Sequence, residues 1–275
     1  MPSSMAAVYS LSKLKPPLAL ELESRLLRAL LNRMYTLGTG QDTTHFRALY
    51  NNYSQSLDIL LRGLLTETPT MEKLQHLLEH IHRSLLSNNT QERARAVQTS
   101  AALLEFATSL PGFDSSSTFS KAGEFVLQLG LWISHPASDI SRQARGGIYW
   151  LYWLLLQKRG LNTREAPDLW CRDGLHDPER LGYRNLARVG EVFGEIFTED
   201  QKSSFFQAGL VAIHHPLLHV SQAGLVLTYS ILGEAGRLLD DEGEITANIL
   251  VQLFNIRVFC QVPDALQGLC SVGQP

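Results

Sequence analysis

The chain has 275 residues, of which 44% are hydrophobic and 19% charged, and this length and composition are typical of a folded chain with one elongated domain or two ordinary ones. The formal net charge is −3, and Lys and Arg are scattered and outnumbered by Asp and Glu, which argues against a nucleic-acid-binding protein with a concentrated basic face. Three Cys, at positions 171, 260 and 270, are odd in number and lack the spacing of metal ligands, so we expect free thiols in a reducing compartment.

The sequence also argues against a secreted or membrane-bound chain. Its N-terminus lacks the charged and then apolar layout of a secretory signal. The longest apolar run, Ile148–Leu156, has nine residues, far fewer than the roughly 20 that cross a bilayer. We therefore expect an intracellular protein, cytoplasmic or nuclear, without a membrane partner.

Residues 1–18 contain Pro16-Pro17 and are predicted to be a disordered N-terminal segment. The chain then continues with a helix over 20–37, whose expected apolar face consists of Leu22, Leu26, Leu30 and Met34. A second helix over 46–64 has a clear 3.6-residue period of apolar side chains, among them Leu57, Leu60, Leu61 and Leu64. The two helices form a first predicted pair at about 20–65.

The second predicted pair covers about 69–110. Thr68-Pro69 is expected to open its first helix, with Pro in the first turn, where its missing N–H does no harm. The apolar face of this helix is predicted from one regular stripe, Met71, Leu74, Leu78, Ile81 and Leu85. A turn over 87–90 leads to the second helix, over 92–106.

The third predicted pair, about 118–158, has an outer helix over 119–133 and an inner helix over 139–158. The inner helix is apolar on nearly all sides from Ile148 to Leu156, which predicts that it is buried. Each Gly in a helix interior costs about 1 kcal/mol relative to Ala. We therefore interpret Gly146-Gly147 as a point where another helix approaches closely.

Gly and Pro residues over 159–182 predict an irregular region, so the fourth pair, about 160–198, has a degraded first helix. Thr198 with Gln201 three residues later has the form of a capping box and opens a fifth pair at about 199–236. A final helix at about 244–260 and a flexible tail over 263–275 complete the predicted elements.

Four segments share a five-residue pattern in which the second residue is Arg or small and polar and the fifth is Ala or Gly. They begin at residues 92, 140, 183 and 220, in steps of 48, 43 and 37 residues. A period of about 40–47 residues is typical of HEAT and armadillo repeats. We therefore predict an all-α fold, a HEAT/armadillo-type α-solenoid of stacked antiparallel helix pairs, as a single domain over 19–262. The small fifth residues allow close helix packing, and they are Ala96, Ala144, Ala187 and Gly224.

The segment from His45 to Phe106 carries a family resemblance, in FRALYNNYSQSLDILLRGLL, PTMEKLQHLLEHIHRSLLS and ERARAVQTSAALLEF. These stretches resemble the maestro heat-like repeat family, and the resemblance continues more weakly to about residue 260. It implies an all-helical HEAT-type solenoid with an interaction role and without known catalysis. Its motifs are diffuse patterns, so no functional residue is transferred from the family, and the chain is short for it.

Two groups of His are candidate metal ligands. His76 and His80, with Glu79, match the H-x-x-E-H arrangement of one class of zinc peptidase. No third ligand is evident, so we expect the pair on solvent, where changing both His to Ala would leave folding nearly intact. A second group, His214, His215 and His219, flanks Pro216 much as His135 precedes Pro136, which indicates turn packing rather than metal binding.

Arg residues near the starts of the inner helices are the candidate partner surface, because inner helices line the concave face of such solenoids. They are Arg93, Arg95, Arg142, Arg145, Arg184 and Arg188. The alternative is that they pair locally with acidic neighbours. The aromatic run Tyr149, Trp150, Tyr152 and Trp153 is either part of the core, which is the commoner case, or a binding patch, because Trp and Tyr are enriched at interface centres.

The sequence thus predicts a non-enzymatic scaffold that binds an unidentified protein partner on a HEAT-repeat surface. It assigns no catalytic, cofactor-binding or metal-binding residue and no cofactor. Two alternatives stay open: an all-helical, metal-dependent hydrolase that uses His76 and His80, and a nucleic-acid-associated adaptor.

Overall fold

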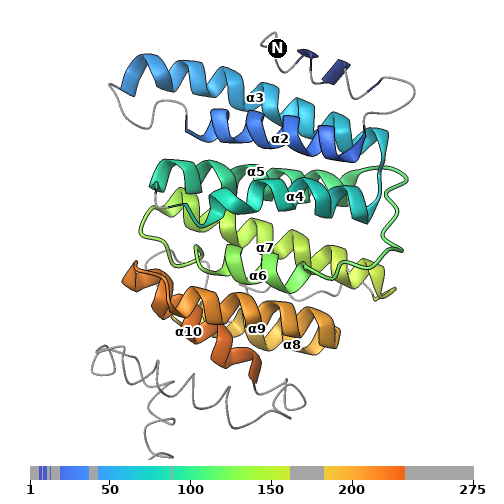
Figure 1. Cartoon of the computed structure of the whole chain (residues 1–275). Coiled ribbons are helices and arrows are strands. Elements are labelled where there is room, and N and C mark those ends of the chain that lie inside the picture. The colour runs from blue at the N-terminus through green and yellow to red at the C-terminus, as the bar shows by residue number, and fades with distance from the viewer. Residues whose placement is uncertain are drawn as a thin grey trace, which may run out of the picture. The chain divides into compact units, whose positions relative to one another are not determined.

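The computed structural model of the chain describes residues 6–7, 9–10, 13, 19–36, 43–87, 89–161 and 183–232, without the side chains of 43–52 and 183–185. The described residues are almost entirely helical (Figure 1), and their β-structure is one isolated bridge between Thr70 and Asp114. The predicted all-α fold is confirmed. Most of the predicted irregular region 159–182, the helix at about 244–260 and the tail 263–275 lie outside the described residues.

The chain divides into two compact units. Unit 1 comprises residues 1–119 and 139–166, and unit 2 comprises residues 120–138 and 167–275. The predicted pair at 118–158 is therefore shared, with its first helix in unit 2 and its second in unit 1. The expectation of one continuous domain over 19–262 stays a prediction.

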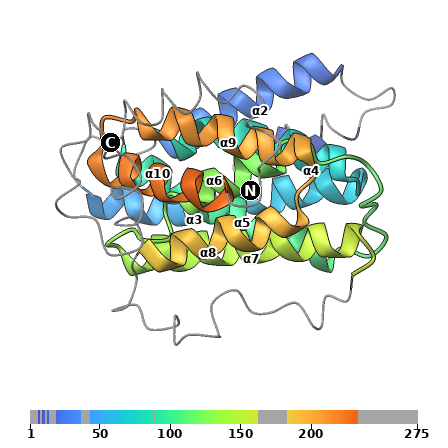
Figure 2. The same cartoon turned by 90° about the horizontal axis from the view of Figure 1, so that it is seen from below.

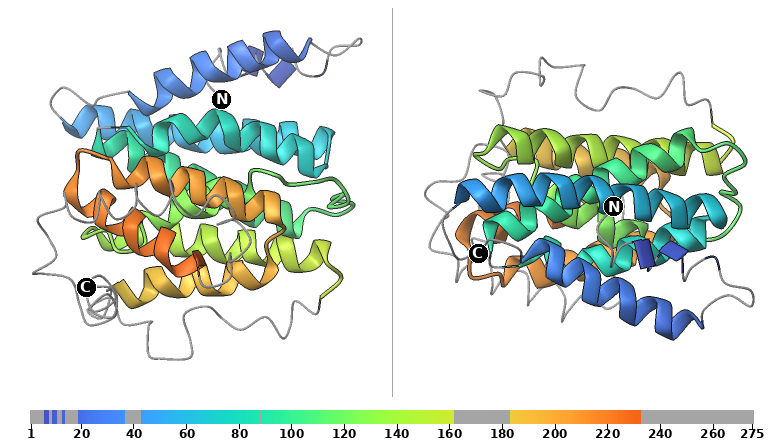
Figure 3. Two further views of the ribbon diagram at one scale, coloured as in Figure 1. Left: turned by 60° about the horizontal axis from the view of Figure 1, so that its bottom comes forward. Right: turned by 90° about the horizontal axis from the view of Figure 1, so that it is seen from above.

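Unit 1 contains α2 (Leu20–Tyr35), α3 (Thr43–Glu67), α4 (Met71–Leu85), α5 (Thr90–Ser109) and α7 (Ser138–Lys158). Helix α4 packs against both α5 and α2, and α3 packs against α5 (Figures 1 and 3). The apolar stripes predicted for the second and third helices form this core, because Leu57, Leu60, Leu61, Leu64, Met71, Leu74, Leu78, Ile81 and Leu85 are all buried.

Two local predictions for unit 1 are wrong. The buried face of α2 consists of Leu27, Leu31, Met34 and Tyr35, whereas Leu22 is 43% exposed. Paired leucines along this helix define two possible stripes one residue apart, and the packed one is the second. Pro69 is also not in the first turn of α4, because the side chain of Thr70 caps this helix by accepting from the N–H of Lys73 at 3.3 Å.

The N-terminal segment makes contacts with α3 at its described residues. The ring of Tyr9 lies so close to Gly63 that a Cβ there would be 2.4 Å from the Tyr9 Cε2. Lys13 lies 3.7 Å from Glu67 and 4.3 Å from the centre of the Tyr9 ring. The described residues within 1–18 are therefore partly helical and in contact with α3, and the disorder of the segment as a whole stays a prediction.

Unit 2 contains α6 (Ala122–Gly130), α8 (Tyr183–Ile196), α9 (Glu199–Ile213) and α10 (Leu218–Leu232). Helix α6 packs against α9, and α10 packs against both α8 and α9 (Figure 2). Helix α6 is shorter than the predicted 119–133, because the chain turns after Gly130. The predicted capping box of α9 is confirmed, since Thr198 and Gln201 each accept a hydrogen bond from the other's backbone N–H.

The small residues of the repeat pattern behave as predicted at three of the four positions. Ala96 and Ala144 are completely buried, and a Cβ on Gly224 would lie 2.8 Å from the Cβ of Ala212. Ala187 is only partly buried, and its neighbour Leu186 occupies the core instead. Close packing therefore explains three of these small residues.

A polar residue at the second position of the pattern is buried in the three copies whose side chains are described. The sequence did not identify these residues as buried. Arg93, Ser141 and Ser221 are 4%, 0% and 6% exposed. The Ser221 hydroxyl donates to the carbonyl of Ile213, the last residue of α9, at 2.6 Å. Carbonyls at a helix end have no partner within the helix. Ser221 therefore ties the start of α10 to the end of α9.

Candidate functional site

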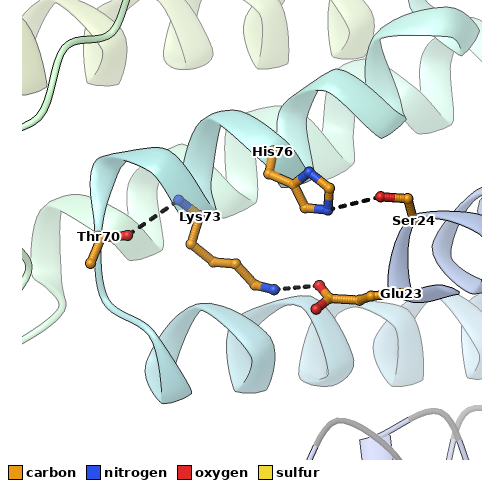
Figure 4. A network of polar contacts seen from close by, with 5 residues as sticks. All are labelled: Glu23, Ser24, Thr70, Lys73 and His76. Carbon is orange, nitrogen blue, oxygen red and sulfur yellow. Dashed lines mark hydrogen bonds and ion pairs between the residues drawn. The ribbon is translucent and has the colours of Figure 1, made fainter. Parts of the chain in front are cut away.

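The histidine pair of α4 faces α2 and not solvent, contrary to our expectation. His76 and His80 are both partly buried, and their ring centroids are 4.7 Å apart in an edge-to-face arrangement. Figure 4 shows the His76 Nε2 directed at the hydroxyl of Ser24, 3.4 Å away on α2. In the same view, Lys73 forms an ion pair with Glu23 of α2. The apolar stripe of α4 predicted one packed face of this helix, but α4 packs against both α5 and α2, and the side toward α2 was not predicted.

The environment of this pair favours neutral imidazoles. Burial is the main cause that lowers the pKa of His80 to about 4, and the positive charges of His76, Arg28 and Arg83 act in the same direction, against Glu79. Burial and the charge of Lys73 also lower the pKa of His76, against Glu23 and Glu79. Within the described part of the chain, no three His, Cys, Asp or Glu side chains gather as potential metal ligands.

We expect acid to destabilise unit 1 through His80. The pKa of His80 is about 4 in the folded chain and about 6.5 in an unfolded chain. Above pH 6.5 His80 is neutral in both states and does not lower the free energy of unfolding. As the pH falls from about 6.5 to about 4, the unfolded state takes up protons that the folded state does not, and the free energy of unfolding decreases. One pKa unit corresponds to about 1.4 kcal/mol, and partial exposure screens the effect, so we expect a loss on the order of 1–2 kcal/mol.

Chemical denaturation between pH 7 and pH 4 measures this loss. His80→Gln is expected to reduce the pH dependence, because the amide has no proton to gain. The pKa of His76 is also lowered, so part of the dependence should remain. An equal dependence in the parent chain and in His80→Gln would show that His80 does not cause it.

The other His group takes part in turns, as predicted. The His135 Nδ1 accepts from the N–H of Ala137 at 3.1 Å, and the His215 Nδ1 accepts from the N–H of Leu217 at the same distance. The two His-Pro turns, before α7 and before α10, therefore have the same internal hydrogen bond. His135 and His219 also contact Trp132, with ring centroids 5.9 and 6.1 Å from it.

Two of the candidate arginines bind groups within unit 1. Arg93 donates to the carbonyl of Ser87 at 2.6 Å and to the hydroxyl of Thr90 at 2.9 Å. Arg95 donates to the carbonyl of Tyr35 at 2.8 Å, at the end of α2, where a positive charge is favoured by the helix dipole. Arg93 therefore binds groups close to it in the sequence and Arg95 binds the end of another helix, and the acceptors of these bonds are carbonyls and a hydroxyl rather than the acidic neighbours of the alternative.

The remaining candidates lie on α7 and α8. The Arg142 side chain is 71% exposed and lies 2.6 Å from Asp139, which is 82% exposed. Arg145 is partly buried one turn further along α7. Arg188 on α8 is 3.9 Å from Glu191, and the side chain of Arg184 lies outside the described residues. Among the candidate Arg residues whose side chains are described, Arg142 on α7 is therefore the most exposed.

The aromatic run of α7 is divided between the core and the surface. Tyr152 is 6% exposed and belongs to the core, together with the leucines around it. Tyr149, Trp150 and Trp153 are only partly buried, and the rings of Tyr149 and Trp150 form an edge-to-face pair at 4.9 Å. The prediction that this helix is buried on nearly all sides is therefore wrong for one side.

One face of α7 combines these aromatic residues with the exposed Arg. Residues three, four, seven and eight positions apart share a helix face. By that spacing Arg142, Arg145, Gly146, Tyr149, Trp150 and Trp153 form a continuous stripe, and none of the six is fully buried. We call these six residues the α7 stripe.

Gly146 is an open position within the α7 stripe. A Cβ built on it would meet no atom of the described residues within 4 Å, so among these residues it is not the close-approach point that we expected. The sequence offered two adjacent glycines, and only Gly147 is buried. Gly146 therefore leaves the backbone of α7 without a side chain at this point of the stripe.

The C-terminal end of α7 is followed by Gly160, whose φ of +65° lies in the left-handed region that favours Gly and terminates helices.

No described helix is both long enough and apolar enough to span a membrane.

Comparison with known proteins gives consistent matches. The family model described as Maestro, HEAT repeats matches residues 91–272, which include α7. The human Maestro heat-like repeat family member 5 is 32% identical over 112 residues, which cover 41% of this chain and 8% of that protein. The mouse family member 1 is 26% identical over 249 residues, 86% of this chain and 15% of that protein.

A third relative, the human Maestro heat-like repeat-containing protein family member 2A, is 30% identical over 268 residues, or 91% of this chain. That alignment covers 15% of the relative. The chain therefore spans only a small part of the length of the curated relatives that it matches.

Proposed function

Because the chain belongs to the Maestro HEAT-repeat family, we propose that it is a non-enzymatic scaffold module that binds a partner protein on the α7 stripe. HEAT-type solenoids bind partners along surfaces made by successive helices. The predicted intracellular location stays a prediction, and the partner shares that compartment.

The observation that carries the proposal is the partial exposure of Tyr149, Trp150 and Trp153 next to Arg142. Trp, Tyr and Arg are the residue types that contribute most to the free energy of binding in protein interfaces. Trp carries a large apolar area and is usually mostly buried, although seldom completely. We propose that a partner covers the parts of Trp150 and Trp153 that stay exposed on this helix face.

Gly146 supports the same proposal by a separate argument. A Gly in a helix interior costs about 1 kcal/mol relative to Ala. At Gly123 or Gly224 this cost is offset because no Cβ fits, but at Gly146 no atom of the described residues occupies the space. A partner backbone that lies against α7 at this point, between the Arg and the aromatic side chains of the stripe, would require that no Cβ be present.

The experiment is affinity capture from cell extract with the full chain, compared with a variant blocked at the open position. Gly146→Gln places a long polar side chain in the middle of the α7 stripe, and its Cβ would clash with no atom of the described part of the chain. We expect this variant to fold at least as stably as the parent. The amount of partner that it captures, measured by mass spectrometry, should be at least tenfold lower. Direct titration of the purified partner then checks the loss of affinity.

The control variant is Tyr229→Ala, which removes an aromatic side chain that is 42% exposed on α10. It is expected to retain the partner at the level of the parent. If Gly146→Gln and the parent capture the same proteins in the same amounts, the α7 stripe is not the binding surface.

A further inference from the structure

Resting on the proposed function, we infer that the partner presents to the α7 stripe a short acidic segment with one aromatic or large aliphatic anchor. The charges and the dimensions of α7 each point to this class of partner.

The charge of α7 is opposite to that of the chain. The whole chain has a net charge of −3. Within α7 the charged residues are Asp139 and three basic ones, Arg142, Arg145 and Lys158. Two of the three basic residues, Arg142 and Arg145, belong to the α7 stripe, in the first half of the helix. A partner with carboxylates is therefore favoured, and a basic partner is disfavoured.

Arg142 can accept a carboxylate at low cost. It pairs with Asp139, but the two side chains are 71% and 82% exposed, and pairs as exposed as this contribute about 0–1 kcal/mol. Exchange of Asp139 for a partner carboxylate is therefore nearly neutral in free energy.

The length of the stripe limits the size of the segment. Trp153 is 11 positions after Arg142. A helix rises about 1.5 Å per residue, so the stripe is roughly 16 Å long. An extended chain covers about 3.3–3.6 Å per residue. About five residues therefore reach from the arginines to Trp153, with the acidic residues at one end, an apolar anchor at the other, and backbone over Gly146 between them.

The test uses the full chain and a display library of random 12-residue peptides. We expect the selected peptides to be acidic, with an aromatic or large aliphatic residue three to five positions from a pair of Asp or Glu. A synthetic peptide of the selected consensus is then titrated by fluorescence polarisation. Arg142→Glu is expected to weaken its binding at least tenfold, and the parent's affinity should fall as salt is added, since salt screens exposed charges.

Arg159→Glu is the matched control. It makes the same change of charge at an exposed residue just beyond the end of α7, outside the stripe, and it should leave the affinity unchanged. Arg142 is itself largely exposed, so its replacement should not impair folding, and circular dichroism checks this for both variants.

The outcomes separate this inference from the proposed function. In one outcome, selected peptides bind the parent chain and Gly146→Gln abolishes their binding, but the peptides are uncharged or bind equally well to Arg142→Glu. The binding surface is then supported, and the acidic partner is refuted. If Gly146→Gln leaves peptide binding intact, the proposed surface itself is refuted. If no peptide is enriched, or if an oligonucleotide binds in place of peptides and is lost with Arg142→Glu, the inferred acidic segment is refuted as well.

Discussion

Gly123→Ala is expected to destabilise unit 2 by about 3 kcal/mol, at or above the upper end of the usual range for overpacking, about 1–3 kcal/mol. A Cβ on Gly123 would lie 1.9 Å from the carbonyl oxygen of Gln201 and 2.7 Å from the backbone nitrogen of Phe205. Both atoms belong to the backbone of α9, which cannot move aside as the tip of a side chain can. Helix α6 would therefore have to separate from α9. Chemical denaturation of the purified chain measures the change.

The same substitution at Gly146 is the control, and we expect the opposite sign. No atom of the described residues lies within 4 Å of the new Cβ there, and Ala is favoured over Gly in a helix interior by about 1 kcal/mol. Gly146→Ala should therefore stabilise the chain by up to that amount. If Gly123→Ala leaves the stability unchanged or raises it, the close contact between α6 and α9 is not as described.

Ala144→Leu is expected to lower the free energy of unfolding by about 1–3 kcal/mol. Ala144 is completely buried on α7, and Leu would add three carbons to a packed site. Such a loss is a large share of the roughly 5–15 kcal/mol that stabilises a typical domain. Thermal unfolding followed by circular dichroism should therefore show a clearly lower Tm.

Ala187→Leu tests whether the position in the repeat or the packing decides this cost. Ala187 occupies the same place in the repeat pattern but is only partly buried. We expect a change below about 1 kcal/mol, as is usual for substitutions outside a packed core. An equal loss of stability at Ala144 and Ala187 would contradict the packing described for α7.

The elements with one regular apolar stripe were the ones that the sequence predicted best. Met71, Leu74 and Leu78 recur at helical spacing and leave no second possible face on α4. Prediction failed on α2, because its leucines occur in adjacent pairs, such as Leu26-Leu27, and so allow two faces. Periodicity identifies a stripe when the apolar residues are unique, and it cannot choose between two overlapping stripes.

The candidate site was predicted only in part, for a related reason. A single sequence shows which residue types are present on a helix but not how many neighbours surround it. His76 was placed on solvent because it lies beside the main stripe of α4, yet α2 covers that side. The aromatic side chains of α7 were expected to be buried, yet Trp150 and Trp153 are partly exposed. Only the packing of neighbouring helices decides these cases.

The most direct test of the central claim is hydrogen exchange, measured by mass spectrometry, on the full chain with and without the captured partner. The proposed function predicts slower exchange of the amides between Arg142 and Trp153 on α7 when the partner is bound, with little change in α9 and α10. Protection confined to α9 or α10, with unchanged exchange along α7, would contradict it.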